Sequence, residues 1–186
     1  MKIPNRPSER DDFIIREAAI MLSTEVADWC REGGDEVEEE GLVDIQNDLF
    51  NAMKWAGNAD GYDLARRLED ASYMSDSQLV EILDASGTHL NTALNKAIQE
   101  WIKAYQVSPK LKIGDKCRAM IRGMEEDGEI VNIYHDSASY SVFIERLGHV
   151  KTGVGTNGII IPWERLDPQP ESQETAPTVV VEHSEA

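Results

Sequence analysis

The sequence predicts an α+β fold, in which an all-α N-terminal bundle is followed by a small β-barrel and a disordered acidic tail. Apolar residues recur at helical spacing as far as position 107, which is typical of amphipathic helices. From position 108 apolar and polar residues alternate, and glycine and β-branched residues become frequent, as in short strands. After Pro168 the composition turns to Pro, Gln, Glu, Ser and Thr, which is typical of disorder. The predicted domains are 1–107, 108–168 and 169–186.

The composition limits the classes of function. The 186 residues include 35 acidic and 18 basic ones, giving a net charge of -17. Broad binding to a phosphate backbone depends on Lys and Arg, so direct nucleic-acid binding is not expected. No apolar stretch has the roughly 20 residues needed to span a bilayer, and the N-terminus lacks the apolar run of a signal peptide. We therefore expect a cytoplasmic protein.

Two long helices are expected first. The first runs from Ser8, its predicted N-cap, to Glu32 and ends at Gly33 and Gly34. The second follows the acidic run 35–40 and ends at 57–58. The residues expected to face inward are Ile14, Ala18, Met21, Leu22, Val26 and Trp29 in the first helix, and Leu42, Ile45, Leu49, Ala52, Met53 and Ala56 in the second.

Three further helices are expected before position 108. The third runs from Gly61 to about Tyr73. Ser75 and Gln78 are predicted to form a capping box at the start of the fourth, which extends to Gly87. The fifth covers 88–107. Their apolar stripes need partners, so the five helices should pack as a bundle. The inward residues are Leu64, Ala65, Leu68 and Ala71, then Leu79, Ile82 and Leu83, then Leu90, Leu94, Ala97, Ile98, Trp101 and Tyr105.

Several short strands follow, as in a small barrel. In the first strand, Cys117, Ala119 and Ile121 alternate on one face. Asp127-Gly128 is predicted as the turn after this strand, and 135–138 as the next turn. The expected strands are 116–121, 129–134, 139–146 and 158–163.

Part of this second domain resembles a Tudor domain, a kind of SH3-like barrel. The opening 111–119 (LKIGDKCRA), the stretch 126–130 (EDGEI) and the closing 161–168 (IPWERLDP) carry the likeness, which covers about a third of the chain. The resemblance implies an SH3-like barrel. Tudor domains bind methylated Arg or Lys in an aromatic cage through cation–π attraction. The cage positions are not aromatic here, at Ile121, at 130–131 and around 144–148, so methyl-mark binding is not expected.

An acidic helical face is the main candidate for binding a partner. A net charge of this size creates a long-range field that speeds encounter with a basic protein. A helical surface dense in carboxylates can also imitate the charge spacing of a nucleic-acid backbone. The alternative interpretation is a solvated face that only keeps the chain soluble. The candidate residues are Asp35, Glu36, Glu38, Glu39, Glu40 and Asp44.

The first strand of the barrel offers a second candidate surface. Residues 110–122 contain five basic side chains and one acidic one. With Cys117 inward, the predicted outward face holds Lys116, Arg118 and Arg122. These bases could contact an anionic partner such as RNA, or could dock against the acidic helices of the same chain.

No residue pattern predicts catalysis, a metal site or a cofactor. The glycines of 153–158 match GxGxxG but lead into a strand rather than a helix, so a hairpin loop is expected. The stretch 58–63 lacks calcium ligands at the first and last loop positions. The four histidines have no ligand spacing. Cys30 and Cys117 are expected to be free thiols, the latter in the core.

The favoured hypothesis is a non-catalytic protein that binds a basic protein partner, including a nucleic-acid-binding one, through its acidic helical face. By association, small acidic proteins of this kind suit phage or mobile-element inhibitors of host machinery, some acting as DNA mimics. The alternative hypothesis is a nucleic-acid-associated adaptor that binds through the basic edge of the barrel.

Overall fold

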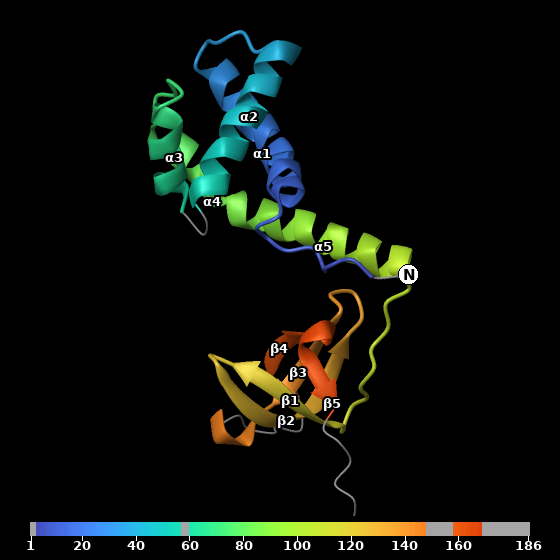
Figure 1. Ribbon diagram of the computed structural model, residues 1–186. Helices are drawn as coiled ribbons and strands as arrows, with labels where there is room; N and C mark the ends of the chain where they lie inside the picture. Colours follow the sequence, from blue (N-terminus) through green and yellow to red (C-terminus); the bar gives the residue numbers. More distant parts are fainter. Residues whose placement is uncertain (1–2, 57–59, 148–157, 169–186) are drawn as a thin grey trace, which may run out of the picture. The chain divides into compact units, whose positions relative to one another are not determined.

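The computed structural model describes residues 3–56, 60–147 and 158–168, and the structural statements below concern these residues. The predicted tail 169–186, the helix end at 57–58 and most of the glycine-rich stretch 153–158 lie outside them. The chain divides into two units, Met1–Ser108 and Pro109–Ala186, which we describe separately. The first is helical and the second is an antiparallel sheet, so the fold is α+β (Figure 1).

Five helices form the described part of the first unit. Helix α1 packs against both α2 and α5, while α3 packs against α2 and α4. None of the helices within the described ranges is long and apolar enough to cross a bilayer. The helices are α1 (Asp12–Glu32), α2 (Glu39–Ala56), α3 (Gly61–Glu69), α4 (Ser77–Asp84) and α5 (Ser86–Tyr105).

The predicted apolar stripe of α1 lies in the core, but the buried face is wider than the stripe. Of the predicted residues, Met21 and Trp29 are half-buried and the other four are buried. Ile15, Ala19 and Ala27 are buried as well. A helix with one covered side needs a single stripe, whereas α1 lies against both α2 and α5 and therefore buries two flanks. In α2, the predicted Ile45, Leu49, Ala52 and Met53 are buried and Leu42 is half-buried, and Phe50 is buried as well.

Two predicted N-caps were wrong, and α2 begins at Glu39, inside the acidic run that it was expected to follow. Helix α1 begins at Asp12, because Ser8 belongs to a separate turn: its backbone N–H and hydroxyl donate to the Asp11 carboxylate at 2.9 and 3.1 Å. At α4 the hydroxyl of Ser75 donates to Glu69 instead of capping the helix. The α4 cap is Asp76, whose carboxylate accepts the backbone N–H of Leu79 at 2.8 Å. At α4, the aspartate next to the predicted cap thus accepts a backbone N–H of the first helical turn.

The helix ends also differ from the prediction. Helix α3 stops at Glu69, and Ala71, which was expected to face inward, is exposed. Ser72 then adopts a left-handed conformation with φ 72°, which ends the helix. Helix α4 ends at Asp84 and α5 begins at Ser86, so the boundary lies two to three residues before the predicted one. The helical spacing of apolar residues is visible in a short stretch of sequence, but where a helix ends depends on these side-chain and backbone contacts.

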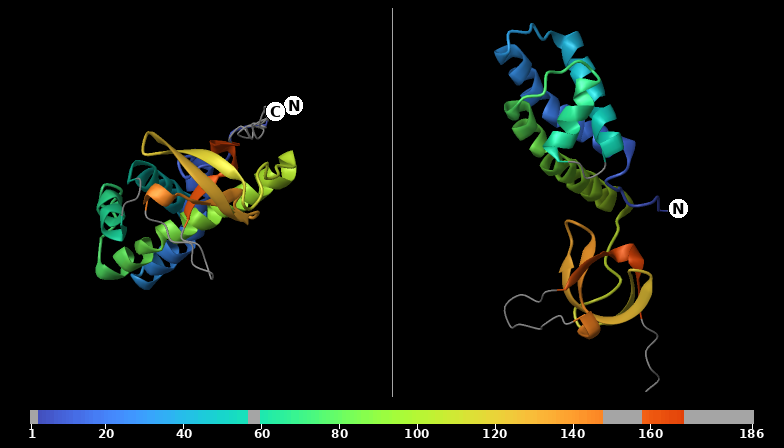
Figure 2. Two further views of the ribbon diagram at one scale, coloured as in Figure 1. Left: turned by 90° about the horizontal axis from the view of Figure 1, so that it is seen from below. Right: turned by 90° about the vertical axis from the view of Figure 1, so that its left-hand side faces the viewer.

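The second unit is a curled antiparallel sheet, a half-barrel in shape (Figure 2). The strand order is β4-β3-β2-β1-β5. Its buried residues include Cys117, Ala119, Ile130, Tyr140 and Val142. The strands are β1 (Lys116–Ile121), β2 (Met124–Tyr134), β3 (Ser139–Phe143), β4 (Ile159–Pro162) and β5 (Leu166–Pro168).

The β1–β2 turn is not where the sequence placed it. Asp127-Gly128 lies inside β2, where Gly128 pairs with Cys117 of β1. The turn is Arg122-Gly123, and both residues have positive φ, 50° and 80°. Positive φ at both central residues is typical of the two-residue turns that match strand twist. Strand β1 itself has the predicted bounds, and the predicted turn at 135–138 is also confirmed.

Strand β3 is shorter than predicted. It ends at Phe143, and Glu145–Leu147 forms a 3₁₀ turn. The expected alternation is absent, because Ser139, Tyr140, Ser141 and Val142 are all buried. Both faces of this strand are therefore covered, which removes the period-two pattern of a half-buried strand.

The sheet contains one buried carboxylate that was not predicted from the sequence. Glu126 of β2 lies opposite the buried Ala119 and is only 7% exposed. Its carboxylate accepts two hydrogen bonds from the Arg146 guanidinium, one from Nε at 2.8 Å and one from Nη2. These hydrogen bonds hold the pKa of Glu126 below its ordinary value. The sequence analysis predicted a turn at Asp127-Gly128 and therefore did not place position 126 in a strand. In the observed register, position 126 is in β2 and faces inward.

This ion pair gives the sheet unit a defined pH dependence. Since the folded pKa of Glu126 is lowered, its stabilisation is present above the ordinary glutamate pKa and is lost as pH falls through the folded value. We expect Glu126→Gln to destabilise the sheet at pH 7 and to change its stability less at pH 3. Urea unfolding followed through sheet amide resonances measures both. Glu125→Gln, at the exposed neighbouring position, is the control, and an equal effect of the two variants at pH 7 would contradict the prediction.

Candidate functional site

The acidic residues singled out in the sequence lie together at the connection between α1 and α2. Helix α1 ends at Glu32, and Gly34, with φ 100°, turns the chain back toward α2. Glu39 and Glu40 form the first turn of α2, where the helix dipole favours carboxylates. We call the six candidate residues the acidic end: Asp35, Glu36, Glu38, Glu39, Glu40 and Asp44.

Contacts beneath the acidic end hold its backbone in place. The Arg31 guanidinium donates to the carbonyl of Val37 at 3.4 Å and to Asp28 Oδ1 at 2.6 Å. The side chain of Val37 packs against the hydrophobic core of the helical unit. Arg31 therefore helps to order this connection. Between positions 32 and 53 the sequence contains eight carboxylates and no Lys, Arg or His.

All six carboxylates of the acidic end are exposed to solvent. Within the described ranges, none of them forms an ion pair or accepts a side-chain hydrogen bond. Asp35 acts only at longer range: with burial, its charge raises the pKa of the Cys30 thiol. The acidic end is thus a patch of hydrated negative charge on a fixed backbone, available to cationic groups.

Many other carboxylates of the helical unit have structural partners. Asp12 pairs with Lys54 at 2.7 Å, and Glu17 pairs with Lys96 at 2.7 Å. Asp48 accepts a hydrogen bond from the Tyr73 hydroxyl at 3.2 Å, and burial together with this carboxylate raises the pKa of Tyr73. Asp60 and Asp76 cap helices, and Asp84 accepts the N–H of Gly61.

The bases of β1 have a different environment, and β1 lies between β2 and β5 rather than at an edge of the sheet as expected. Lys116 Nζ lies 2.6 Å from Glu129 Oε2 on β2. Arg118 lies 3.6 Å from both Glu125 and Asp127. The antiparallel register places Glu129 opposite Lys116 and Asp127 opposite Arg118, with Glu125 on the diagonal. Arg122, expected on the same outward face, is instead in the β1–β2 turn. The positive charge predicted for this edge is therefore largely balanced by β2.

The two cysteines are buried in the described part of the chain. Cys30 and Cys117 are both free thiols, as expected, and Cys117 is buried as predicted; Cys30 is buried as well. Burial raises the pKa of Cys117 to about 11, which suppresses the reactive thiolate. Within the described residues, no three His, Cys, Asp or Glu side chains lie close enough together to hold a metal ion.

The aromatic residues of the sheet do not line a common exposed surface. Tyr140 is buried, and its hydroxyl accepts the backbone N–H of Leu111 at 3.0 Å. It packs against Trp163, which also lies edge-on to His135. Tyr134, by contrast, is 41% exposed.

Comparisons with protein-family models, curated proteins and solved structures gave no match to this chain.

Proposed function

We propose that this chain is a non-catalytic binding protein whose acidic end recognises a basic surface on another protein. The observation that supports this proposal is the contrast between the two charged surfaces. The six carboxylates of the acidic end are exposed on an ordered backbone and are unpaired within the described part of the chain. By contrast, Lys116 and Arg118 of β1 have acidic neighbours on β2.

The chemistry of the acidic end fits Lys and Arg side chains. Exposed carboxylates act at long range, so they accelerate encounter with a basic partner and select against acidic ones. Such a partner includes a protein whose basic groove binds nucleic acid. In that case the acidic end would occupy the groove in place of the phosphate backbone. The curled sheet of the second unit is compatible with an SH3-like barrel.

The adaptor hypothesis has weaker support. An adaptor that binds nucleic acid needs cations that are available to phosphates. Lys116 and Arg118 would have to exchange their contacts with Glu125, Asp127 and Glu129 for phosphate contacts. The acids would then repel the nucleic acid from the same face.

Charge removal at the acidic end tests the proposal. We expect Glu36→Gln, Glu38→Gln, Glu39→Gln and Glu40→Gln together to slow association with a partner captured from lysate about tenfold or more at low salt. The difference should shrink as salt approaches about 1 M, where the screening length falls to about 3 Å. Surface-immobilised binding kinetics measure both effects, and circular dichroism checks the fold.

The control removes the same charge from exposed acids elsewhere in the helical unit: Glu9→Gln, Asp70→Asn, Glu81→Gln and Glu100→Gln. If both sets slow association equally, net charge alone is responsible and the proposed site is wrong. If Lys116→Gln, Arg118→Gln and Arg122→Gln abolish binding while the acidic-end variant binds normally, the adaptor hypothesis replaces the proposal. Competition by duplex DNA for the captured partner distinguishes a nucleic-acid-binding partner from another basic protein.

A further inference from the structure

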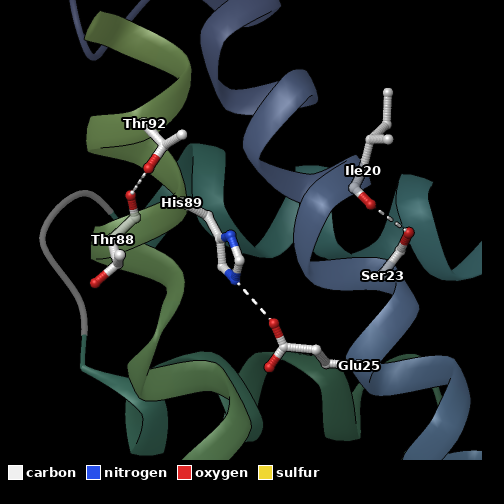
Figure 3. A network of polar contacts seen from close by, with 6 residues as sticks. All are labelled: Ile20, Ser23, Glu25, Thr88, His89 and Thr92. Carbon is white, nitrogen blue, oxygen red and sulfur yellow. Dashed lines mark hydrogen bonds and ion pairs between the residues drawn. The ribbon is translucent and has the colours of Figure 1, made fainter.

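The C-terminal end of α5 extends beyond the helix that covers it. Helices α1 and α5 run antiparallel, as two contacts show: Glu25 meets His89 at 3.1 Å, and Glu17 meets Lys96 at 2.7 Å (Figure 3 shows the first). Eight residues back along α1 thus correspond to seven residues forward along α5. Because both helices rise about 1.5 Å per residue, the N-terminal end of α1, at Asp12, lies at about the level of Trp101.

The apolar stripe of α5 continues past this level. Ile98, Trp101 and Tyr105 follow at the spacing of one helix face. Trp101 is only 8% exposed and Ile98 is 2% exposed, although neither belongs to the hydrophobic cluster that fills the rest of the helical unit. Tyr105 is half-buried.

A segment before α1 contacts this part of α5. Residues 3–7 have no regular secondary structure, and the segment lies alongside α5 in Figure 1 and Figure 2. The indole N–H of Trp101 donates a hydrogen bond to the carbonyl of Pro4 at 3.2 Å. Pro4 and Pro7 each fix φ and favour an extended conformation in the preceding residue. The segment is therefore a short extended peptide with the spacing Pro-x-x-Pro.

We propose that Trp101 and the adjoining turn of α5 form a binding site for an extended, proline-containing peptide, and that residues 3–7 of the same chain occupy it. An extended proline-rich backbone has no internal hydrogen bonds, so its carbonyls need donors from outside. A tryptophan supplies one donor and a flat apolar surface, the combination that recognises such peptides. This site is distinct from the acidic end and does not depend on its function.

The connection to α1 allows the segment to leave without unfolding the helix. Ile3, Pro4 and Asn5 are exposed to solvent even while the segment is bound. The Ser8–Asp11 turn lies between the segment and α1 and is closed by its own hydrogen bonds, including Asp11 N–H to the Ser8 carbonyl at 3.0 Å. Segments with exposed backbone and few buried contacts open at the lowest free-energy cost. A peptide of the same chemistry can therefore compete for Trp101.

The test uses the full chain and the indole N–H resonance of Trp101, assigned with Trp101→Phe. In the double variant Pro4→Gly, Pro7→Gly we expect this proton to exchange with water about five- to tenfold faster, since the hydrogen bond to residue 4 is weakened. The indole protons of Trp29, Trp55 and Trp163 are internal controls and should not change. An unchanged Trp101 exchange rate in the double variant would overturn the proposal.

A peptide titration then tests the ligand class. A synthetic peptide with the sequence of residues 1–9, added at about millimolar concentration, should restore slow exchange of the Trp101 proton in the double variant. The same peptide with both prolines replaced by glycine should not. No response to the first peptide, or an equal response to both, would show that Trp101 does not recognise this class. Exchange that slows as the wild-type protein is concentrated would show that the segment comes from a second copy, contrary to the proposal.

Discussion

Gly61→Ala is expected to destabilise the helical unit by about 3 kcal/mol. A Cβ atom at this position would lie 2.3 Å from the backbone oxygen of Val80 and 2.7 Å from the backbone nitrogen of Asp84. Both atoms belong to α4, so α3 and α4 would have to separate. Separating the two helices would also break the hydrogen bond from Gly61 N–H to Asp84 Oδ1, which is 2.7 Å long.

The matched control is Gly87→Ala in the first turn of α5. A Cβ there meets nothing within 4 Å, so the helix-favouring alanine should stabilise the unit by about 0.5–1 kcal/mol. Urea unfolding followed by circular dichroism at 222 nm compares the two variants. Shifts of the same sign and size would contradict the close packing of α3 on α4.

Gly128→Ala is expected to destabilise the sheet unit by about 2–3 kcal/mol. The added Cβ would lie 2.5 Å from Val142 Cγ1 and 3.1 Å from the backbone oxygen of Phe143. Val142 is fully buried in β3, so its methyl group has no empty space to enter. Strands β2 and β3 would separate locally.

A double-mutant cycle isolates this contact. Val142→Ala alone creates a cavity and should cost about 2 kcal/mol, but it also makes room for a Cβ at position 128. We expect Gly128→Ala to cost at least about 1 kcal/mol less when Val142→Ala is present. Sheet amide resonances in urea report the unfolding of this unit. Strictly additive effects would mean that the clash is relieved elsewhere and that Gly128 is not needed for strand approach.

Local patterns in the sequence were sufficient where neighbouring residues decide the structure. The helical spacing of Leu64, Leu68, Leu79 and Leu83 predicted buried faces, and all four are buried. The alternation in 116–121 predicted β1 with its correct bounds. The exposure of the acidic end could also be predicted, since a run of like charges is not buried without partners. These features depend on period and solvation, which are properties of a short stretch of chain.

Contacts between distant residues overrode several local patterns. Asp127-Gly128 has the composition of a turn, yet β3 approaches Gly128 so closely that the residue must lie inside a strand, and Arg122-Gly123 makes the turn. The same register sets Asp127 opposite Arg118 and Glu125 diagonally across from it, which balances the positive charge expected from β1 alone.

The sequence by itself determined the order of the five helices and of the first four strands, the position of the acidic run and the change of period near position 108, but not strand β5. Only the tertiary structure decided which charges are paired, because strand register joins residues whose spacing in the chain does not reveal their partners. It also decided that Trp101 meets Pro4, 97 positions away in the sequence. Hydrophobic periodicity is encoded within a few turns of chain, whereas pairing and close approach are set by the packing of whole elements.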